Sequence, residues 1–226
     1  MLKNENIYIV VPVYNEAPVI EETIREIKSA GYKNIIVVDD GSLDETYQKI
    51  TKLDVISLRL PINRGKGAAI KTGIEAAKIL GVDIVVTMDG DGQHNPLDIE
   101  KMLTVMRKDA IDVILGTRLK NPKGMPCYKI WANRLGNFFT WLFYGLWVSD
   151  SQSGFRVYSQ KAINLINTQT DRYEYDSEVI REIGRHKLTF REVPIEVRYT
   201  NYSMNKINRQ GLKNGLKTLI KMLISI

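Results

Sequence analysis

The sequence predicts an α/β protein whose central, mostly parallel β-sheet is flanked by helices. Runs of β-branched residues alternate with helical segments through the first half of the chain. The runs are almost entirely apolar, which is typical of strands in a sheet that helices cover on both faces. Each run ends in a polar loop, and in such sheets ligands bind beyond the carboxyl ends of the strands.

The predicted elements follow one another in order. Five apolar runs are predicted strands: residues 7–13, 34–42, 54–60, 82–89 and 111–118. Four segments between them are predicted helices: residues 17–31, a helix that starts at 42, 66–81 and 95–108. Helix boundary signals support these assignments.

The first helix has Pro18 in its first turn and Gly31 at its end, the usual places for these residues. Ser42 and Glu45 have the spacing of a capping box for the second helix. In the fourth helix we expect Asn95 as the cap, with Pro96 in the first position.

The second half of the chain has a different character. Aromatic residues gather between 131 and 147: Trp131, Trp141 and Trp147, with Phe138, Phe139 and Phe143 beside them. This segment is too short to span a membrane. A polar loop at 150–159, a helix at 176–186 and a strand at 190–199 follow.

Composition narrows the class of protein. The 226 residues include 44% hydrophobic and 26% charged residues, enough for one sizeable core. The single cysteine, Cys127, excludes a disulfide framework within the chain and is consistent with a reducing compartment. The N-terminal apolar run has no cleavage site of a signal peptide.

The net charge of +6 is unevenly distributed. Residues 201–226 contain five basic residues and no acid, and the rest of the chain is close to neutral. The basic residues of this tail include Lys213, Lys217 and Lys221 on one predicted helical face, with leucines largely on the other. A basic tail on a neutral body favours contact with an anionic surface over nucleic-acid binding.

The loop after the fourth strand carries the most informative polar pattern. Asp89 and Asp91 alternate with Gly90 and Gly92 at the end of a predicted buried strand. Two like charges at this spacing repel each other unless a cation lies between them. Hard carboxylate oxygens suit Mg²⁺ or Mn²⁺ shared with substrate phosphates. The alternative is an ordinary turn, because Asp and Gly are common in turns.

Other loops add groups of the same kind. After the second strand, the pair Asp39 and Asp40 can bind a base or a ribose, or cap the next helix. In the first loop, Glu16 can bind a ribose hydroxyl and Tyr14 can contact a base. The "NRGKG" loop at 63–67 suits a diphosphate, although it matches neither a Walker P-loop nor a G-x-G-x-x-G motif.

Taken in order, these motifs resemble glycosyltransferase family 2, and especially its polyprenyl-phosphate (dolichol-phosphate) hexosyltransferase branch. The motifs are "VVPVYNE", "VVDDGSLDET", "NRGKGAAIKTGIEAA", "VVTMDGDGQHNP", "GTR" and "DSQSGFR", and the resemblance covers about residues 7–200. It implies a GT-A fold over residues 1–202, a nucleotide-diphosphate sugar donor carrying UDP or GDP, Mg²⁺ or Mn²⁺, and inversion at the anomeric carbon. Residues 203–226 would then form a basic amphipathic helix.

The resemblance assigns roles to particular residues. Those implied at the nucleotide are Pro12, Tyr14, Glu16, Asp39, Asp40, Lys66, Gly67, Asp89 and Gly90. Those implied at the metal are Asp89, Asp91 and Gln93, where the glutamine is typical of the lipid-phosphate branch. Those implied near the acceptor are Arg118, Arg134, Ser153, Gly154 and Arg156. His94 is the weakest candidate ligand. The family's usual His-Asn after strand three is Ile62-Asn63 here.

Under this hypothesis, Arg118 and Arg156 hold phosphate oxygens through forked hydrogen bonds. A lipid phosphate is already an anionic nucleophile, whereas a sugar hydroxyl needs a carboxylate to take its proton. Asp150 is the candidate base, or else a loop residue that orients Arg156.

The aromatic segment and the basic tail suggest peripheral contact with a membrane, at its cytoplasmic face, unless the aromatics belong to the core. Three rival functions remain: a transferase acting on a hydroxyl of a polysaccharide or glycolipid, a sugar-nucleotide pyrophosphorylase, and a non-catalytic membrane-binding module. The first loop lacks the Gly-rich, Arg-Lys signature that a pyrophosphorylase would need.

Overall fold

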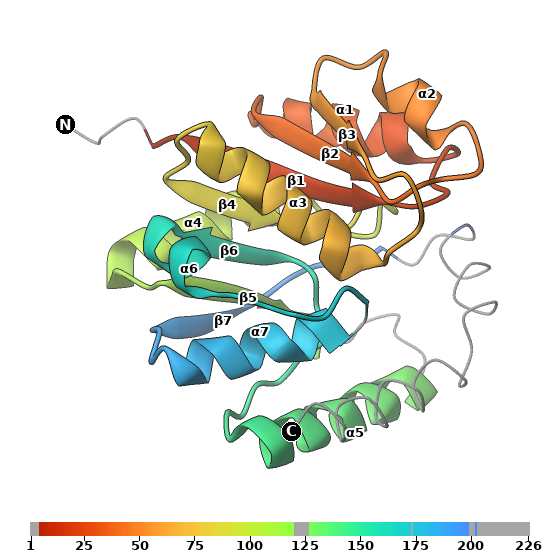
Figure 1. Cartoon of the computed structure of the whole chain (residues 1–226). Coiled ribbons are helices and arrows are strands. Elements are labelled where there is room, and N and C mark those ends of the chain that lie inside the picture. Colours follow the sequence, from red (N-terminus) through yellow and green to blue (C-terminus); the bar gives the residue numbers. More distant parts are fainter. Residues whose placement is uncertain (1–4, 120–126, 173, 199–201, 203–226) are drawn as a thin grey trace.

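A computed structural model describes residues 5–119, 127–172, 174–198 and 202, and the basic tail lies outside these residues. Its seven strands form one sheet in the order β3-β2-β1-β4-β6-β5-β7 (Figure 1). The strands are β1 (Ile7–Val13), β2 (Ile35–Asp39), β3 (Ile56–Arg59), β4 (Ile84–Thr87), β5 (Val113–Thr117), β6 (Arg156–Ser159) and β7 (Phe190–Pro194). The predicted α/β architecture is confirmed.

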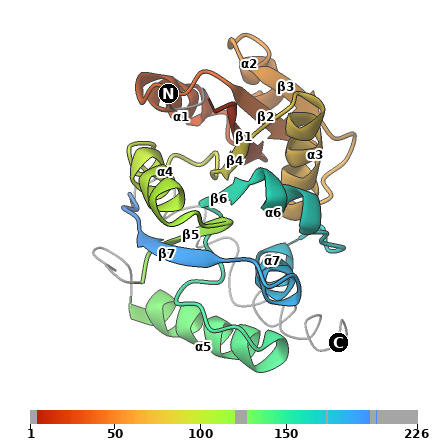
Figure 2. The same cartoon turned by 90° about the vertical axis from the view of Figure 1, so that its left-hand side faces the viewer.

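The helices cover both faces of the sheet. They are α1 (Ile20–Ser29), α2 (Thr46–Ile50), α3 (Lys66–Ile79), α4 (Asp98–Asp109), α5 (Cys127–Tyr144), α6 (Gln160–Leu165) and α7 (Glu174–Arg185). Figure 2 shows α4 on one side of the sheet and α3, α6 and α7 on the other. Two buried apolar clusters result, one under α1, α2 and α4 and one under α3, α6 and α7.

One strand runs against the others. β6 lies between β4 and β5 and is antiparallel to both, whereas β1 pairs in parallel with β2 and β4, β2 with β3, and β5 with β7. The sequence predicted only a polar loop at 150–159, so the strand at 156–159 corrects that prediction. Because β6 enters the sheet from the opposite end, the loop that precedes it reaches the carboxyl ends of β4 and β5.

The helix boundaries follow most of the predicted signals. Gly31 follows α1 with φ 98°, a conformation that glycine adopts without strain. The side chain of Asn95 accepts a hydrogen bond from Leu97 N, but α4 begins only at Asp98. The capping box was wrong: α2 has no side-chain cap, and Ser42 Oγ instead accepts a hydrogen bond from Asn15 N.

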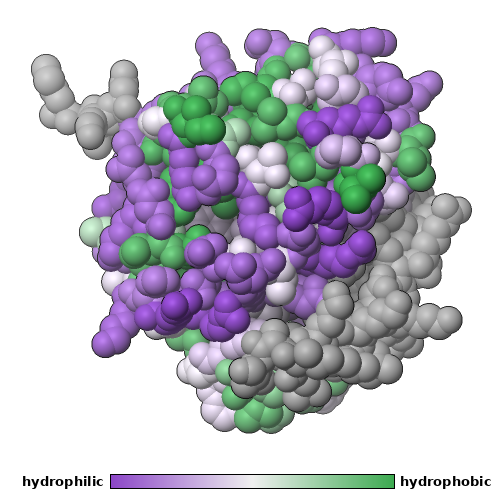
Figure 3. Space-filling model, in the orientation of Figure 1, coloured by the Kyte–Doolittle hydropathy of each residue, from purple (hydrophilic) through white to green (hydrophobic). Residues whose placement is uncertain are grey.

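Helix α5 lies outside the sheet, beside α7 (Figures 1 and 2). The sequence predicted an aromatic segment here but left open whether it belonged to the core. Trp131, Trp141 and Trp147 are all exposed, as are Leu135 and Leu142. In Figure 3, green hydrophobic residues lie at the lower edge of the molecule, where Figure 1 shows α5. No helix among the described residues is long and apolar enough to cross a bilayer.

Candidate active site

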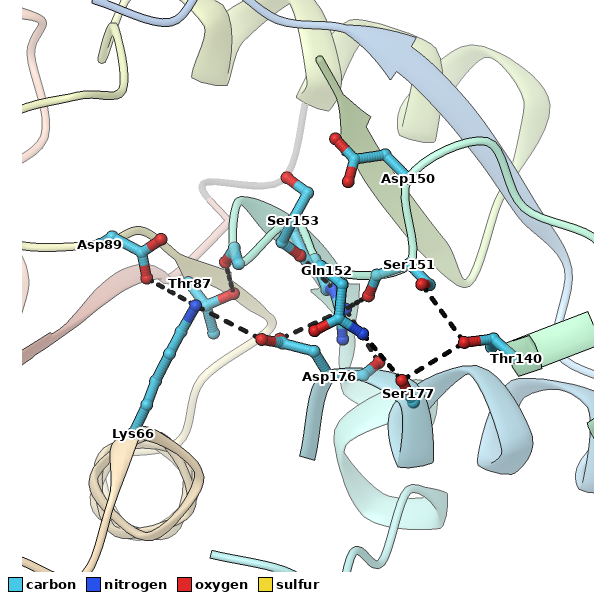
Figure 4. A network of polar contacts seen from close by, with 12 residues as sticks. Lys66, Thr87, Asp89, Thr140, Asp150, Ser151, Gln152, Ser153, Asp176 and Ser177 are labelled. Carbon is cyan, nitrogen blue, oxygen red and sulfur yellow. Dashed lines mark hydrogen bonds and ion pairs between the residues drawn. The ribbon is translucent and has the colours of Figure 1, made fainter. Parts of the chain in front are cut away.

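The predicted site lies where the loops after the strands meet the loop before β6. Asp89, just past β4, pairs with Lys66 at the start of α3, with 2.8 Å between Nζ and Oδ1 (Figure 4). Lys66 also faces Asp176 of α7, 3.6 Å away. The sequence singled out Lys66 and Asp89 separately, but nothing in it indicated Asp176, whose segment lies far along the chain.

The electrostatics of this pair keep both groups charged. Burial alone would raise the pKa of Asp89, but the nearby charge of Lys66 outweighs it and lowers that pKa to about 2. Burial acts on Lys66 in the opposite sense, and the carboxylates of Asp176 and Asp89 raise its pKa above the usual value. Asp89 is therefore an ionised carboxylate at neutral pH, the form that a metal ion binds.

The chemistry of the remaining loop residues fits a hard divalent cation. Asp91 lies two residues beyond Asp89, and its Oδ1 accepts a hydrogen bond from Gln93 N at 3.0 Å. Among the residues that the structure describes, the buried amide nitrogen of Gln93 has no hydrogen-bond partner. A rotation about the last side-chain bond exchanges that nitrogen with the amide oxygen, a ligand that Mg²⁺ and Mn²⁺ accept.

Among the described residues there is no group of three or more His, Cys, Asp or Glu side chains arranged for a metal. A cation at Asp89 and Asp91 would take its other ligands from substrate phosphates and water. This is the usual way in which Mg²⁺ binds in sites that transfer phosphorylated groups.

His94 is buried next to the loop that carries Asp89. Its ring stacks on Phe155 with 5.0 Å between centroids, and its Nδ1 accepts a hydrogen bond from Asp89 N at 3.4 Å. Burial lowers the pKa of His94 to about 4, so the imidazole is neutral at pH 7. His94 thus supports the loop that carries Asp89 through this hydrogen bond and through its stacking on Phe155.

Asp40 organises the loop of residues 63–67. Its two carboxylate oxygens accept hydrogen bonds from Arg64 N and Gly65 N, each at 2.8 Å. Burial raises its pKa, and the two amide hydrogen bonds oppose that shift. A contact from Asp40 to a base would therefore use the remaining lone pairs of oxygens that already hold the loop.

Asp39 is completely buried. Its carboxylate accepts a hydrogen bond from Ser42 N and pairs with Arg59 Nε at 3.2 Å. Direct contact between Asp39 and a nucleotide does not fit this geometry, so we correct that assignment to support of the loop after β2.

The loop after β1 has an unexpected partner. Glu16 Oε2 accepts a hydrogen bond from the hydroxyl of Tyr202 at 2.8 Å, and the same hydroxyl lies 3.2 Å from Asn15 O. Pro12 lies within β1 and is buried, whereas Tyr14 precedes Glu16 on this loop and is half-buried. Tyr202 was missed because no pattern in the sequence links it to residues near the N-terminus.

Two glycines assigned to the nucleotide lie in tight packing contacts. A Cβ on Gly67 would lie 2.7 Å from Tyr175 Cβ, which shows how closely α3 packs on α7. A Cβ on Gly90 would lie 2.4 Å from Val13 Cγ1. Both are needed for packing between segments, which is sufficient reason for a glycine at each position.

Arg118 and Asp150 form a forked ion pair at the end of β5. Arg118 Nε donates to Oδ2 and Nη2 to Oδ1, both at 2.7 Å, and the backbone N of Arg118 donates to Oδ2 at 3.0 Å. Asp150 is buried, whereas the guanidinium of Arg118 is partly exposed. The predicted alternative, in which Asp150 orients Arg156, is wrong: its partner is Arg118.

Arg156 does not have the open position that a phosphate ligand needs. Its side chain is 1% exposed and donates hydrogen bonds to the carbonyl oxygens of Ser151, Ser153 and Asp176. It also pairs with the Asp176 carboxylate at 3.3 Å. We correct its assignment from the acceptor to the support of the loop before β6.

The other residues expected near the acceptor separate into two groups. Ser153 is buried, and Gly154 lies against the Lys66–Asp89 pair: a Cβ there would meet Lys66 Nζ at 2.2 Å. Arg134 lies on α5 and is exposed. The structure thus brings Gly154 into the site and leaves Arg134 on the helix outside the sheet.

Comparison with known proteins identifies the family. The profile of glycosyl transferase family 2 matches residues 8–166. An uncharacterized protein of Methanocaldococcus jannaschii is 41% identical, covering 99% of this chain and 93% of its own. The UDP-N-acetylglucosamine–dolichyl-phosphate N-acetylglucosaminyltransferase of Methanococcus voltae is 39% identical, covering 88% of each chain.

The fold has a solved counterpart. Glucosyl-3-phosphoglycerate synthase from Mycobacterium tuberculosis, crystallised with Mn²⁺, UDP and glucosyl-3-phosphoglycerate, superposes with a TM-score of 0.71. That similarity covers 98% of this chain and 80% of the synthase, and at 18% identity it shows the fold alone. The chain therefore belongs to glycosyl transferase family 2 and is a glycosyltransferase with the GT-A fold.

Proposed function

We propose that this glycosyltransferase moves a hexose from a nucleoside-diphosphate sugar to a polyprenyl phosphate, with a divalent cation and with inversion at the anomeric carbon. The relative from M. voltae supports UDP-N-acetylglucosamine as the first donor to test, with other UDP- and GDP-sugars after it. Its name also supports a dolichyl-type phosphate as the acceptor.

The choice of acceptor rests on one observation: the carboxylate of Asp150 is already bound by another side chain. Both of its oxygens are held by Arg118, and the carboxylate is buried. A sugar hydroxyl would need a base to take its proton, and this carboxylate is already engaged. A lipid phosphate is anionic at neutral pH and needs no such base, so the geometry favours it over a hydroxyl.

The remaining residues divide the work of the reaction. Asp89 and Asp91, with Gln93, would hold Mg²⁺ or Mn²⁺, and the ion would supply positive charge against the leaving diphosphate. Lys66 lies close enough to Asp89 to contact the same diphosphate. Arg118, oriented by Asp150, would bind the acceptor phosphate and direct its oxygen towards the anomeric carbon. Glu16 and Asp40 belong to the loops that would hold the nucleoside.

The exposed face of α5 supports peripheral membrane contact, which we place at the cytoplasmic face. On this face Trp131 is 71% and Trp141 42% exposed, and tryptophan favours the membrane–water interface. The basic tail, outside the described residues, would add attraction to anionic lipids of about 1 kcal/mol per cation near the surface.

The test is sugar transfer from UDP- and GDP-sugars to polyprenyl phosphate, with Mg²⁺, with Mn²⁺ and with a chelator. We expect metal-dependent transfer by the wild type and a loss of about 100-fold or more in Asp91→Ala, because one of two metal carboxylates is gone. Asp54→Ala removes a fully exposed acid elsewhere and is expected to behave like the wild type.

Calorimetric titration with UDP separates binding from chemistry. UDP affinity should depend on the metal in the wild type and weaken in Asp91→Ala. Transfer only to sugar hydroxyls would favour the rival acceptor, and no transfer to lipid phosphate from any donor would reject the proposal.

A further inference from the structure

Helix α5 has its polar side turned inward. Its outer face carries Trp131, Leu135, Phe138 and Leu142 at helical spacing, all exposed to solvent. Its inner face carries Asn137 and Thr140, which are 3% and 0% exposed. This is the reverse of a helix packed on an apolar core, whose polar side faces water. The inner polar groups must therefore be satisfied by hydrogen bonds within the protein.

Asn137 bonds to the loop on both sides of Asp150. Its Nδ2 donates to the carbonyl oxygen of Ser149, and its Oδ1 accepts from Ser151 N and Ser151 Oγ, each at 2.9 Å. The two serines stand on either side of Asp150. One amide group on α5 thus fixes the backbone both before and after the carboxylate that binds Arg118.

Further contacts from α5 and from β7 hold the same loop. Thr140 Oγ1 lies 3.3 Å from Ser151 Oγ and 3.4 Å from Ser177 Oγ. Figure 4 shows the side chain of Thr140 pointing towards both serines. Glu192 of β7 accepts hydrogen bonds from the backbone N and the hydroxyl of Ser149. Ser149 is thus held from both α5 and β7, whereas the side-chain contacts of Ser151 come from α5.

The connection from the helix to the proposed acceptor site is short. Asn137 holds Ser149 and Ser151, Asp150 stands between them, and both oxygens of Asp150 hold the guanidinium of Arg118. A guanidinium held by two parallel hydrogen bonds has a fixed plane and direction. Any shift of the backbone at Asp150 turns Arg118 with it, and a displacement of about 1 Å can cost on the order of 100-fold in rate.

We propose that Asn137 is a positioning residue that joins α5 to Arg118 and sets the direction of that guanidinium for the acceptor phosphate. The proposal rests on the proposed function, since it assumes that Arg118 binds the acceptor. Under this proposal, α5 both carries the exposed apolar face and orients Arg118, through the segment 149–151.

The experiment compares Asn137→Ala with Ser159→Ala in transfer to polyprenyl phosphate. Ser159 Oγ caps α6 by accepting a hydrogen bond from Ala162 N, so its loss removes a stabilising contact that is unrelated to Arg118. We expect Asn137→Ala to lower kcat/KM for the acceptor by about 10- to 100-fold and to leave UDP affinity within about twofold of the wild type. Ser159→Ala should change neither value by more than about twofold.

A double-mutant cycle with Arg118→Lys provides the decisive readout. Lysine cannot form the forked pair with Asp150. In the Arg118→Lys background, Asn137 can therefore no longer set the direction of a guanidinium. Asn137→Ala should therefore cost less than about threefold in Arg118→Lys enzyme. If Asn137→Ala does not fold, Thr140→Val replaces it in the same cycle, with a smaller expected loss.

Three results would overturn the proposal. The first is an additive cycle, and the second is a loss of acceptor kcat/KM in Ser159→Ala that equals the loss in Asn137→Ala. The third is a wild type that binds UDP but transfers nothing to polyprenyl phosphate, which rejects the proposed function itself. The wild-type assay therefore distinguishes failure of the function from failure of the role of Asn137.

Discussion

Gly154 leaves the space in which the ammonium of Lys66 meets the carboxylate of Asp89. A Cβ at this position would lie 2.2 Å from Lys66 Nζ and 2.8 Å from Asp89 Oδ1. Both atoms are at the ends of flexible side chains, so Gly154→Ala should displace them without moving the backbone. We expect its melting temperature to stay within about 3 °C of the wild type and its transfer rate to fall at least about tenfold.

The control is a glycine with rigid neighbours. A Cβ on Gly116 would lie 2.7 Å from the carbonyl oxygen of Phe155 and 3.0 Å from Ile195 Cγ2. Backbone cannot move aside as a lysine tip can, so Gly116→Ala should lose about 1–3 kcal/mol of unfolding free energy. Thermal unfolding and initial rates, measured on both variants, distinguish the two effects. Equal destabilisation of both variants would contradict the role given to Gly154.

The sequence identified single charged residues of the site but not their partners. Asp89 and Lys66 stood out because each follows a strand in a polar loop. One of the two alternatives for Asp150, that it orients Arg156, is wrong, since nothing in the local pattern distinguishes Arg118 from Arg156. The partner depends on which strand ends meet, and that depends on the position of β6 in the sheet.

At the level of elements, the parallel strands were predictable and β6 was not. A buried parallel strand is a continuous apolar run, and β1, β2 and β4 have this pattern. β6 has only four residues and begins with a buried arginine. A buried arginine is tolerated because carbonyl oxygens and Asp176 surround it, and those contacts form only in the folded chain.

Helix α5 gives a prediction about membrane contact. Trp131 and Leu142 are 71% and 55% exposed on its outer face, so polar replacements there cost the folded protein little. We expect Trp131→Ser with Leu142→Ser to keep the melting temperature and to weaken binding to anionic lipid vesicles at least about tenfold, because each buried apolar side chain contributes roughly 1.5–3 kcal/mol. Vesicle co-sedimentation measures the change.

The matched control for α5 lies on α3. Ile79 is 87% exposed and is also apolar, but it belongs to a helix on a face of the sheet. Ile79→Ser should leave vesicle binding unchanged. If it weakens binding as much as the α5 substitutions do, or if those have no effect, α5 is not the surface that meets the lipid.

At the scale of the whole molecule, the site depends on contacts between distant parts of the chain. Lys66 and Asp89 come from the first half, and Asp176 and Gly154 from the second. Buried carboxylates secure other segments: Asp112 accepts hydrogen bonds from the distant Thr189, and Glu178 from Thr170 in the loop before its own helix. Burial opposes ionisation of both. The pKa of Asp112 is nevertheless lowered, by Lys161 and then by the Thr189 hydrogen bonds, and the pKa of Glu178 is lowered mainly by the Thr170 hydrogen bonds. Both groups therefore stabilise the fold above the pKa of an unfolded carboxyl and cease to do so in acid.

His94 makes stability depend on pH in a milder range. Its pKa is about 4 in the folded protein, where burial opposes the charge, against 6.5 for the ordinary side chain. Between these values the unfolded chain binds a proton that the folded protein does not, so the free energy of unfolding falls as pH falls. From pH 7 to 5 we expect a loss of about 2 kcal/mol from this residue, measured by urea unfolding in chelator. His94→Gln should remove most of that slope, while replacement of the other histidine, His186→Gln, should retain it. An undiminished slope in His94→Gln would show that another group takes up the proton.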